Sequence, residues 1–118
     1  MTERFLIFGH RGSPKRFPEN TLASFDEAIR AGADGFETDL RLLTDKLAIL
    51  YHDDEFFDDD VESLSSIDLA ERGAVLNRLS ELALYATRTT MILEVKRAKW
   101  EDVLLQQVSA WPNVIIAS

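Results

Sequence analysis

The sequence contains no cysteine among its 118 residues, which excludes disulfide bonds, cysteine-ligated zinc and thiol nucleophiles. It also lacks a long hydrophobic run: the apolar segment from Phe5 to Phe8 ends at Gly9, whereas a membrane-spanning helix needs about 20 apolar residues. The first residues carry neither a basic segment nor a small-residue cleavage site. We therefore expect no transmembrane segment, no signal peptide and a cytoplasmic protein.

Positive charge is scarce as well. Lysine and arginine total 13 against 21 aspartate and glutamate residues, which gives a formal net charge of -8. This balance argues against nucleic acid as a partner, because such binding depends on neutralising phosphates with basic side chains. The remaining composition is that of an ordinary globular chain, with 46% hydrophobic residues over the length of about one domain.

The acidic residues are concentrated in one segment. Between Asp53 and Glu62 there are seven carboxylates and no basic residue. A block of like charge is typical of a solvated loop, and this is the interpretation that we favour. The alternative is a calcium-binding loop, but the spacing argues against it. Ser63 follows the pattern Asp58-x-Asp60-x-Glu62, with no glycine at the sixth position and no glutamate at the twelfth.

Short apolar runs bounded by turn residues predict five strands, and apolar residues at helical spacing predict helices between them. Strands that alternate with helices indicate βα units around a parallel sheet. Residues 41–46 are short enough for the second and third strands to be neighbours or to form a hairpin. The expected strands are Arg4–Phe8, Gly35–Leu40, Leu47–Tyr51, Met91–Val95 and Val114–Ala117.

The expected helices are marked by their apolar stripes and their ends. The first is capped by Asn20 or Thr21 and closed by Gly32. Two more stripes follow, and Ser80 is a possible cap for the second of them. A last stripe is stopped by Pro112. The stripes are Leu22, Phe25 and Ile29; Leu64, Ile67 and Ala70; Leu76, Leu79, Leu82 and Ala86; and Trp100, Val103, Leu104, Gln107 and Val108.

Polar side chains recur where the expected strands end. Residues two apart on a strand point to the same face, and the carboxyl ends of parallel strands are where ligands and catalytic groups gather. Taken singly, each of these polar residues has an ordinary explanation: a histidine can be a hydrogen-bonded loop residue, and an acidic pair can simply be solvated. Their recurrence on successive strands favours one shared site. These residues are His10 and Arg11, Glu37 and Asp39, His52, and Glu94 and Lys96.

The chemistry of these residues is that of a phosphate-ester hydrolase. Glu37, Asp39 and Glu94 offer hard oxygen ligands of the kind that Mg²⁺ or Ca²⁺ prefers. Arg11 and Lys96 are suited to contact an anion. Two histidines can divide the roles of acid and base near neutral pH.

At these positions the sequence resembles the glycerophosphodiester phosphodiesterase family in order and spacing. The resemblance extends from Arg4 to Ser118 and covers about half of the family's length. It implies an α/β fold of the TIM-type (β/α)₈ barrel family, of which residues 1–118 form a partial domain, about the first half, ending near strand four to five. The motifs that carry it are Gly9-His10-Arg11-Gly12, Pro18-Glu19-Asn20-Thr21, Glu37-Thr38-Asp39, His52-Asp53 and Leu93-Glu94-Val95-Lys96.

The resemblance implies hydrolysis of a glycerophosphodiester to glycerol 3-phosphate and an alcohol, with a divalent metal, Mg²⁺ or Ca²⁺, as cofactor. Asn20 could equally be a helix cap. The matching positions are Glu37, Asp39 and Glu94 for the metal, His10 and His52 for acid and base catalysis, and Arg11, Lys96, Glu19 and Asn20 for the substrate.

Two departures from the family pattern bear on function. Residues 54–60 replace a Leu-x-Arg-Thr-Thr-like segment, and the small inserted subdomain that follows is shorter. A half barrel would also leave sheet edges and inner-face residues uncovered, so we expect two copies to associate or a second chain to supply the rest, unless the sequence is a truncation. Alternative functions are an inactive truncated remnant, whose exposed sheet serves for association or has no role, and lysophospholipase D-type cleavage.

Overall fold

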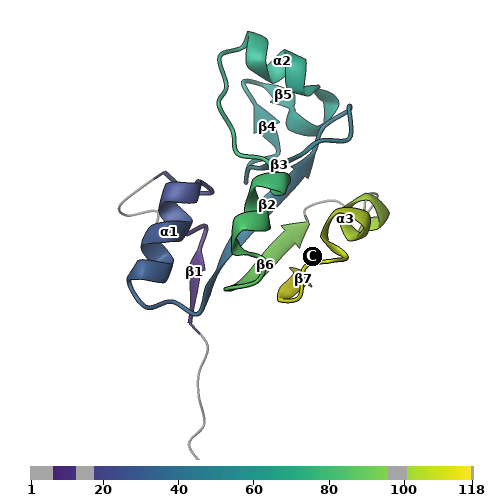
Figure 1. Cartoon of the computed structure of the whole chain (residues 1–118). Coiled ribbons are helices and arrows are strands. Elements are labelled where there is room, and N and C mark those ends of the chain that lie inside the picture. The colour runs from purple at the N-terminus through teal and green to yellow at the C-terminus, as the bar shows by residue number, and fades with distance from the viewer. Residues whose placement is uncertain (1–6, 13–17, 96–100, 118) are drawn as a thin grey trace, which may run out of the picture.

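The computed structural model describes residues 7–12, 18–95 and 101–117. Helices alternate with strands along most of the chain, as the sequence predicts (Figure 1). The strands are β1 (Phe8–His10), β2 (Gly35–Leu42), β3 (Ala48–Leu50), β4 (Glu55–Phe56), β5 (Asp59–Asp60), β6 (Thr90–Val95) and β7 (Val114–Ala117). The helices are α1 (Leu22–Arg30), α2 (Ser66–Glu71) and α3 (Glu101–Val108), with the 3₁₀ helices η1 (Val61–Ser63) and η2 (Leu79–Tyr85).

The main sheet is parallel through four strands in the order β1-β2-β6-β7, which confirms the predicted α/β class. The register places His10 beside Glu37, and Asp39 beside Glu94. The end of β2 pairs instead with β3, which runs antiparallel to it. Of the two arrangements left open for residues 41–46, the hairpin is the one that forms. Because β2 contacts all three neighbours, its register sets the position of every strand around it.

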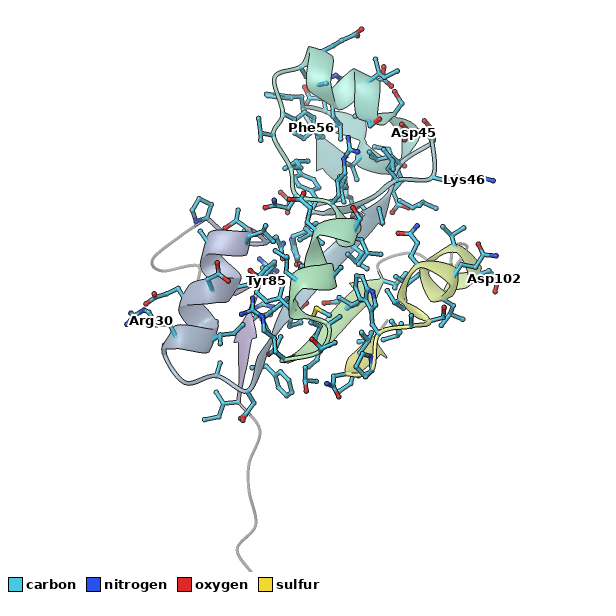
Figure 2. All side chains as sticks on the ribbon, in the orientation of Figure 1. Arg30, Asp45, Lys46, Phe56, Tyr85 and Asp102 are labelled. Carbon is cyan, nitrogen blue, oxygen red and sulfur yellow. The ribbon has the colours of Figure 1, made fainter. Side chains whose placement is uncertain are left out.

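The hydrophobic core lies between the sheet and the helices α1, η2 and α3. The Phe25 and Phe36 rings stack with their centroids 4.1 Å apart, and the Tyr85 ring meets Phe36 edge-on at 5.1 Å. The Tyr85 hydroxyl donates a hydrogen bond of 2.6 Å to Asp26 of α1, which ties η2 to that helix. In Figure 2 Tyr85 lies in the interior, whereas Arg30 points outward from α1. The opposite face of the sheet carries the acidic residues of β2 and β6 together with the apolar Ile92 and Ile115.

Residues 55–71, which lie between β3 and η2 in the chain, form a small unit above the sheet (Figure 1). Its elements are β4, β5, η1 and α2, and its Val61 belongs to a separate apolar cluster that includes Leu43 and Ile49. The expectation of a simple solvated loop for the acidic segment is therefore wrong in part. β4 and β5 form a hairpin there, and Asp54 and Glu62 both pair with the buried Arg41.

Several element boundaries differ from those predicted. His10 is the last residue of β1 rather than the first residue after it, and residues 4–6 of the expected strand lie outside the described part of the chain. β2 continues past Leu40 to Leu42 because its end pairs with β3. Ser80 caps no helix: η2 begins before it, and the Arg78 backbone N–H donates to the Glu81 carboxylate instead. Among the described helices, none combines the length and the hydrophobicity needed to cross a bilayer.

The turn after β1 requires glycine at Gly12. Its φ is +86°, and a Cβ added there would lie 2.3 Å from the Ser24 Oγ of α1. Gly12 donates its backbone N–H to the Gly9 carbonyl at 3.0 Å, which closes the turn that carries Arg11. The His-Arg-Gly sequence is thus a packing requirement as well as a set of polar groups.

Gly12→Ala should lower the free energy of unfolding by about 2 kcal/mol or more, because left-handed strain of about 1 to 2 kcal/mol adds to an overlap with Ser24 that costs about 1 to 3 kcal/mol. Gly73→Ala is the matched control, since Gly73 has a φ of +78° but open space around the added Cβ. Urea denaturation would compare the two. Equal losses would contradict the proposed overlap.

Candidate active site

Three carboxylates converge on the face of the sheet opposite the core. Glu37 and Asp39 come from β2 and Glu94 from β6, where Asp39 and Glu94 are register partners. One oxygen from each carboxylate lies within 4.8 Å of the others. The parallel part of β2 ends just beyond Asp39, so the cluster sits toward the carboxyl ends of the parallel strands. This is the arrangement that period-two spacing on neighbouring strands predicts.

The electrostatics of the cluster favour a bound cation. Glu37 is 9% exposed, and neither of its carboxylate oxygens accepts a hydrogen bond from the described residues. Burial, followed by the charges of Asp39 and Glu94, raises the pKa of Glu37 to about 7. Carboxylate oxygens are the ligands that Mg²⁺ and Ca²⁺ prefer. The donor set therefore fits a divalent cation of this kind, which would offset the repulsion among the three groups.

His10 and Arg11 lie at the edge of this cluster. His10 Nε2 is 3.3 Å from Glu37 Oε2, and its side chain is 69% exposed. Arg11 has a φ of +55°, so the turn directs its side chain back toward β2. Its Nε lies 3.3 Å from Asp39 Oδ2, and its Nη1 lies 3.3 Å from Glu19 Oε1. Arg11 thus links the acidic cluster to the loop before α1.

Asn20 is buried and holds the backbone and side chain of Asp39. Its Nδ2 donates to Asp39 Oδ2 at 3.2 Å, and its Oδ1 accepts from the Asp39 N–H at 3.3 Å and from the Thr38 hydroxyl at 2.8 Å. The cap of α1 is Thr21, whose hydroxyl accepts from the Ser24 N–H. Of the two roles expected for Asn20, the contact with the site is therefore the one that the geometry provides.

His52 follows an antiparallel strand, whereas the sequence predicts that it follows a parallel one. It follows β3, and because β3 is antiparallel to β2, His52 does not lie at the carboxyl end of a parallel strand. Its Nδ1 is 2.9 Å from Asp53 Oδ1. His52 lines a cavity of about 300 Å³ together with Arg11, Glu19 and Asn20. The remaining predicted residue, Lys96, lies outside the described part of the chain.

Arg41 is a site residue that the motifs of the sequence do not predict, and it contacts the loop that carries His52. It is 2% exposed, and its Nη2 donates to the His52 carbonyl at 3.0 Å. A signal was present in the sequence: Arg41 is two residues beyond Asp39 on the same strand, so it shares a face with Glu37 and Asp39.

The fold and the site together define an α/β protein of the barrel type, with a polar, acidic site at one end of its parallel strands. The sequence model described as the glycerophosphoryl diester phosphodiesterase family matches residues 10–116, and the chain belongs to this family.

Relatives with known sequences or structures agree with this assignment. The glycerophosphodiester phosphodiesterase of Thermotoga maritima is 28% identical, with a TM-score of 0.84 over 98% of this chain and 54% of that one. The enzyme of that name from Agrobacterium tumefaciens is 25% identical, with a TM-score of 0.80 over 96% of this chain and 57% of that one. These solved structures are TIM barrels.

Among curated proteins, a glycerophosphodiester phosphodiesterase of Caldanaerobacter subterraneus is 45% identical over 49 residues, which are 42% of this chain and 20% of that protein. The chain spans about half the length of the solved relatives that it matches.

Glu37→Gln should raise the melting temperature of the metal-free protein by a few degrees at neutral pH, because an amide replaces a nearly buried carboxylate beside two like charges. The same change, and Glu94→Gln, should abolish the stabilisation by millimolar Mg²⁺ or Ca²⁺, which is about 2.7 kcal/mol at 100 times the dissociation constant. Differential scanning fluorimetry would measure both effects, with Glu71→Gln on the exposed side of α2 as the control. A wild-type melting curve that metal leaves unchanged would contradict the shared site.

Proposed function

We propose that residues 1–118 form the first half of the catalytic domain of a metal-dependent phosphodiesterase that cleaves glycerophosphodiesters to glycerol 3-phosphate and an alcohol. The observation that carries this proposal is the approach of Glu37, Asp39 and Glu94 to within 4.8 Å of one another, with His10 and Arg11 in contact with them. Membership of the family supports the choice of substrate.

Glu37, Asp39 and Glu94 would hold the cation, Mg²⁺ or Ca²⁺. The bound cation supplies Lewis-acid polarisation of the phosphoryl group. Arg11 lies between two carboxylates, Asp39 and Glu19, so its guanidinium is held at the edge of the cluster, where it donates to a phosphate oxygen. Glu19 and Asn20 frame the phosphate on the side of α1. Contact between Lys96 and the phosphate stays a prediction.

The two histidines transfer the protons that the reaction requires. One removes a proton from the attacking group, either the neighbouring hydroxyl of the substrate glycerol or a water molecule, and the other protonates the departing alcohol. His10 stands beside Glu37, whereas His52 lines the cavity that adjoins Arg11. Because His10 contacts the carboxylate cluster and His52 lines the cavity, a division of roles between them is supported.

The cavity favours a second candidate among related reactions, lysophospholipase D-type cleavage. The lining of the cavity includes apolar residues, Val75 and Leu76, besides its polar ones. Val75 is 97% exposed, so its side chain is accessible to a ligand. Parallel assays with glycerophosphocholine and with lysophosphatidylcholine would separate the two activities.

We also propose that the active form is an assembly, in which a second copy or another chain covers the open face of the sheet, and that it works in the cytoplasm. On β7, Ile115 is 48% exposed and shares the open face with Ile92 and Glu37, and β1 and β7 stand at the two ends of the described strand order. Exposed apolar residues and sheet edges drive association.

Analytical ultracentrifugation of the purified chain at micromolar concentration should therefore give a dimer or a larger species. Ile115→Asp should shift the distribution toward the monomer, because a charge on this face opposes its burial. Leu84→Asp is the control, since Leu84 is also exposed, at 63%, but belongs to η2. A well-folded wild-type monomer would contradict association.

His10→Ala and His52→Ala should each lower the turnover number for glycerophosphocholine by at least about 100-fold, with little change in KM, because each removes one proton-transfer group. The assay compares them with Glu71→Ala, using whichever form is active, this chain as an assembly or this chain joined to the remaining half of a relative's barrel. A histidine variant with near-normal turnover would reduce that residue to a structural role. Absence of hydrolysis by every wild-type form would instead favour the inactive remnant.

A further inference from the structure

Arg41 occupies an unusual position for a charged residue, in the interior of the molecule and on the same side of β2 as Glu37 and Asp39. It is 2% exposed, and its guanidinium contacts three separate acceptors. Nη2 donates to the His52 carbonyl at 3.0 Å and to Asp54 Oδ1 at 2.5 Å, and Nη1 donates to Glu62 Oε2 at 3.2 Å. The acceptors lie 11 to 21 residues further along the chain.

The contact with His52 completes a pair of attachments on either side of that residue. The Tyr51 N–H donates to the Asp39 carbonyl at 3.0 Å, and the His52 carbonyl accepts from Arg41. Both partners belong to β2 and are two residues apart. The two-residue segment Tyr51–His52 is therefore fixed at both ends to the strand that bears Glu37 and Asp39.

A purely structural role does not account for the choice of arginine. Burying a charge costs several kcal/mol, and well-packed apolar residues of similar volume often replace buried ion pairs without loss of stability. A guanidinium, in contrast, presents donors in a rigid fork, so it can hold a backbone carbonyl and a carboxylate at a fixed separation. The fork of Arg41 is used in this way, with Nη2 on the loop of His52 and Nη1 on Glu62 of the unit above the sheet.

We propose that Arg41 is a positioning residue that fixes the His52 imidazole relative to the carboxylate cluster, without itself touching the substrate. The inference rests on the proposed function, because it assigns Arg41 to the proton transfer that His52 carries out. A misplacement of about 1 Å can cost about 100-fold in rate, so loosening the attachment should lower turnover more than substrate affinity.

Two substitutions separate positioning from folding. Arg41→Lys keeps the positive charge opposite Asp54 and Glu62, so the unit above the sheet retains a charge partner, but a single ammonium cannot reproduce the fork. Arg41→Gln removes the charge as well. Glu62→Gln is the matched control: it weakens the other arm of the same network and leaves the His52 carbonyl contact in place.

The first readout needs no activity. The chain has two histidines, so its imidazole NMR spectrum contains two sets of signals, and His10→Ala assigns them. In Arg41→Lys and Arg41→Gln the His52 signals should shift or broaden, the His10 signals should stay in place, and the Tyr51 amide should exchange faster with solvent. Glu62→Gln should leave all three unchanged. His52 signals that are unaffected in both Arg41 variants, or equally affected in Glu62→Gln, would overturn the proposal.

The second readout is kinetic, with the active form and glycerophosphocholine. Arg41→Lys should lower kcat at least about tenfold while KM changes by less than about twofold, and Glu62→Gln should retain most of the turnover. Loss of turnover to the same extent in Glu62→Gln would overturn the proposal in favour of a structural role for the whole network. If no wild-type form hydrolyses the substrate, the proposed function fails, whereas the imidazole spectra still decide whether Arg41 holds His52 in place.

Discussion

The register of β2 is the constraint on which the rest of the structure depends. This strand places His10 of β1 beside Glu37, Glu94 of β6 beside Asp39, and Leu50 of β3 beside Leu40. Because side chains alternate along a strand, a shift of one residue would turn the carboxylates toward the helices and the apolar residues away from the core. Phe36 and Leu40, which are fully buried in the core, hold the strand against such a shift. The packing on one face therefore fixes the chemistry on the other.

The same strand concentrates like charges where burial makes them costly. Glu37 has a raised pKa because it is nearly buried beside Asp39 and Glu94. Arg11 and Asn20 compensate in part, the first by its charge and the second by hydrogen bonds to Asp39. Proteins accept such local conflicts at functional sites and offset them with stability elsewhere. In this chain that stability comes from the apolar layer of Phe25, Phe36 and Tyr85 on the opposite face of the sheet.

Local sequence patterns predicted the features of the fold and the site that depend on residues close together in the sequence. The alternation of strands with helices predicted the parallel sheet, the two-residue spacing put Glu37 and Asp39 on one face, and the apolar run Met91–Val95 placed Glu94 on a strand. The hairpin of β2 and β3 that precedes His52 is not predicted uniquely, because a six-residue connection suits a hairpin as well as two strands that are merely neighbours. The solvated-loop interpretation of the acidic segment is wrong in part because its residues pair with Arg41, which lies 13 to 21 residues away and is related to them by no periodicity. Arg41 has the spacing of a site residue, but the predicted strand ends at Leu40, whereas β2 continues to Leu42 because it pairs with β3.

The continuity of β2 has a further consequence for the proposed function. Its first half belongs to the parallel sheet, and its last residues form the hairpin that leads into the unit above the sheet. A domain closes over its ligand by bending at a hinge, but a strand shared by both parts is stiff where a hinge would have to be. Under the proposed function, the choice of alcohol should therefore depend on cavity residues such as Val75 and Leu76 rather than on the swing of a lid.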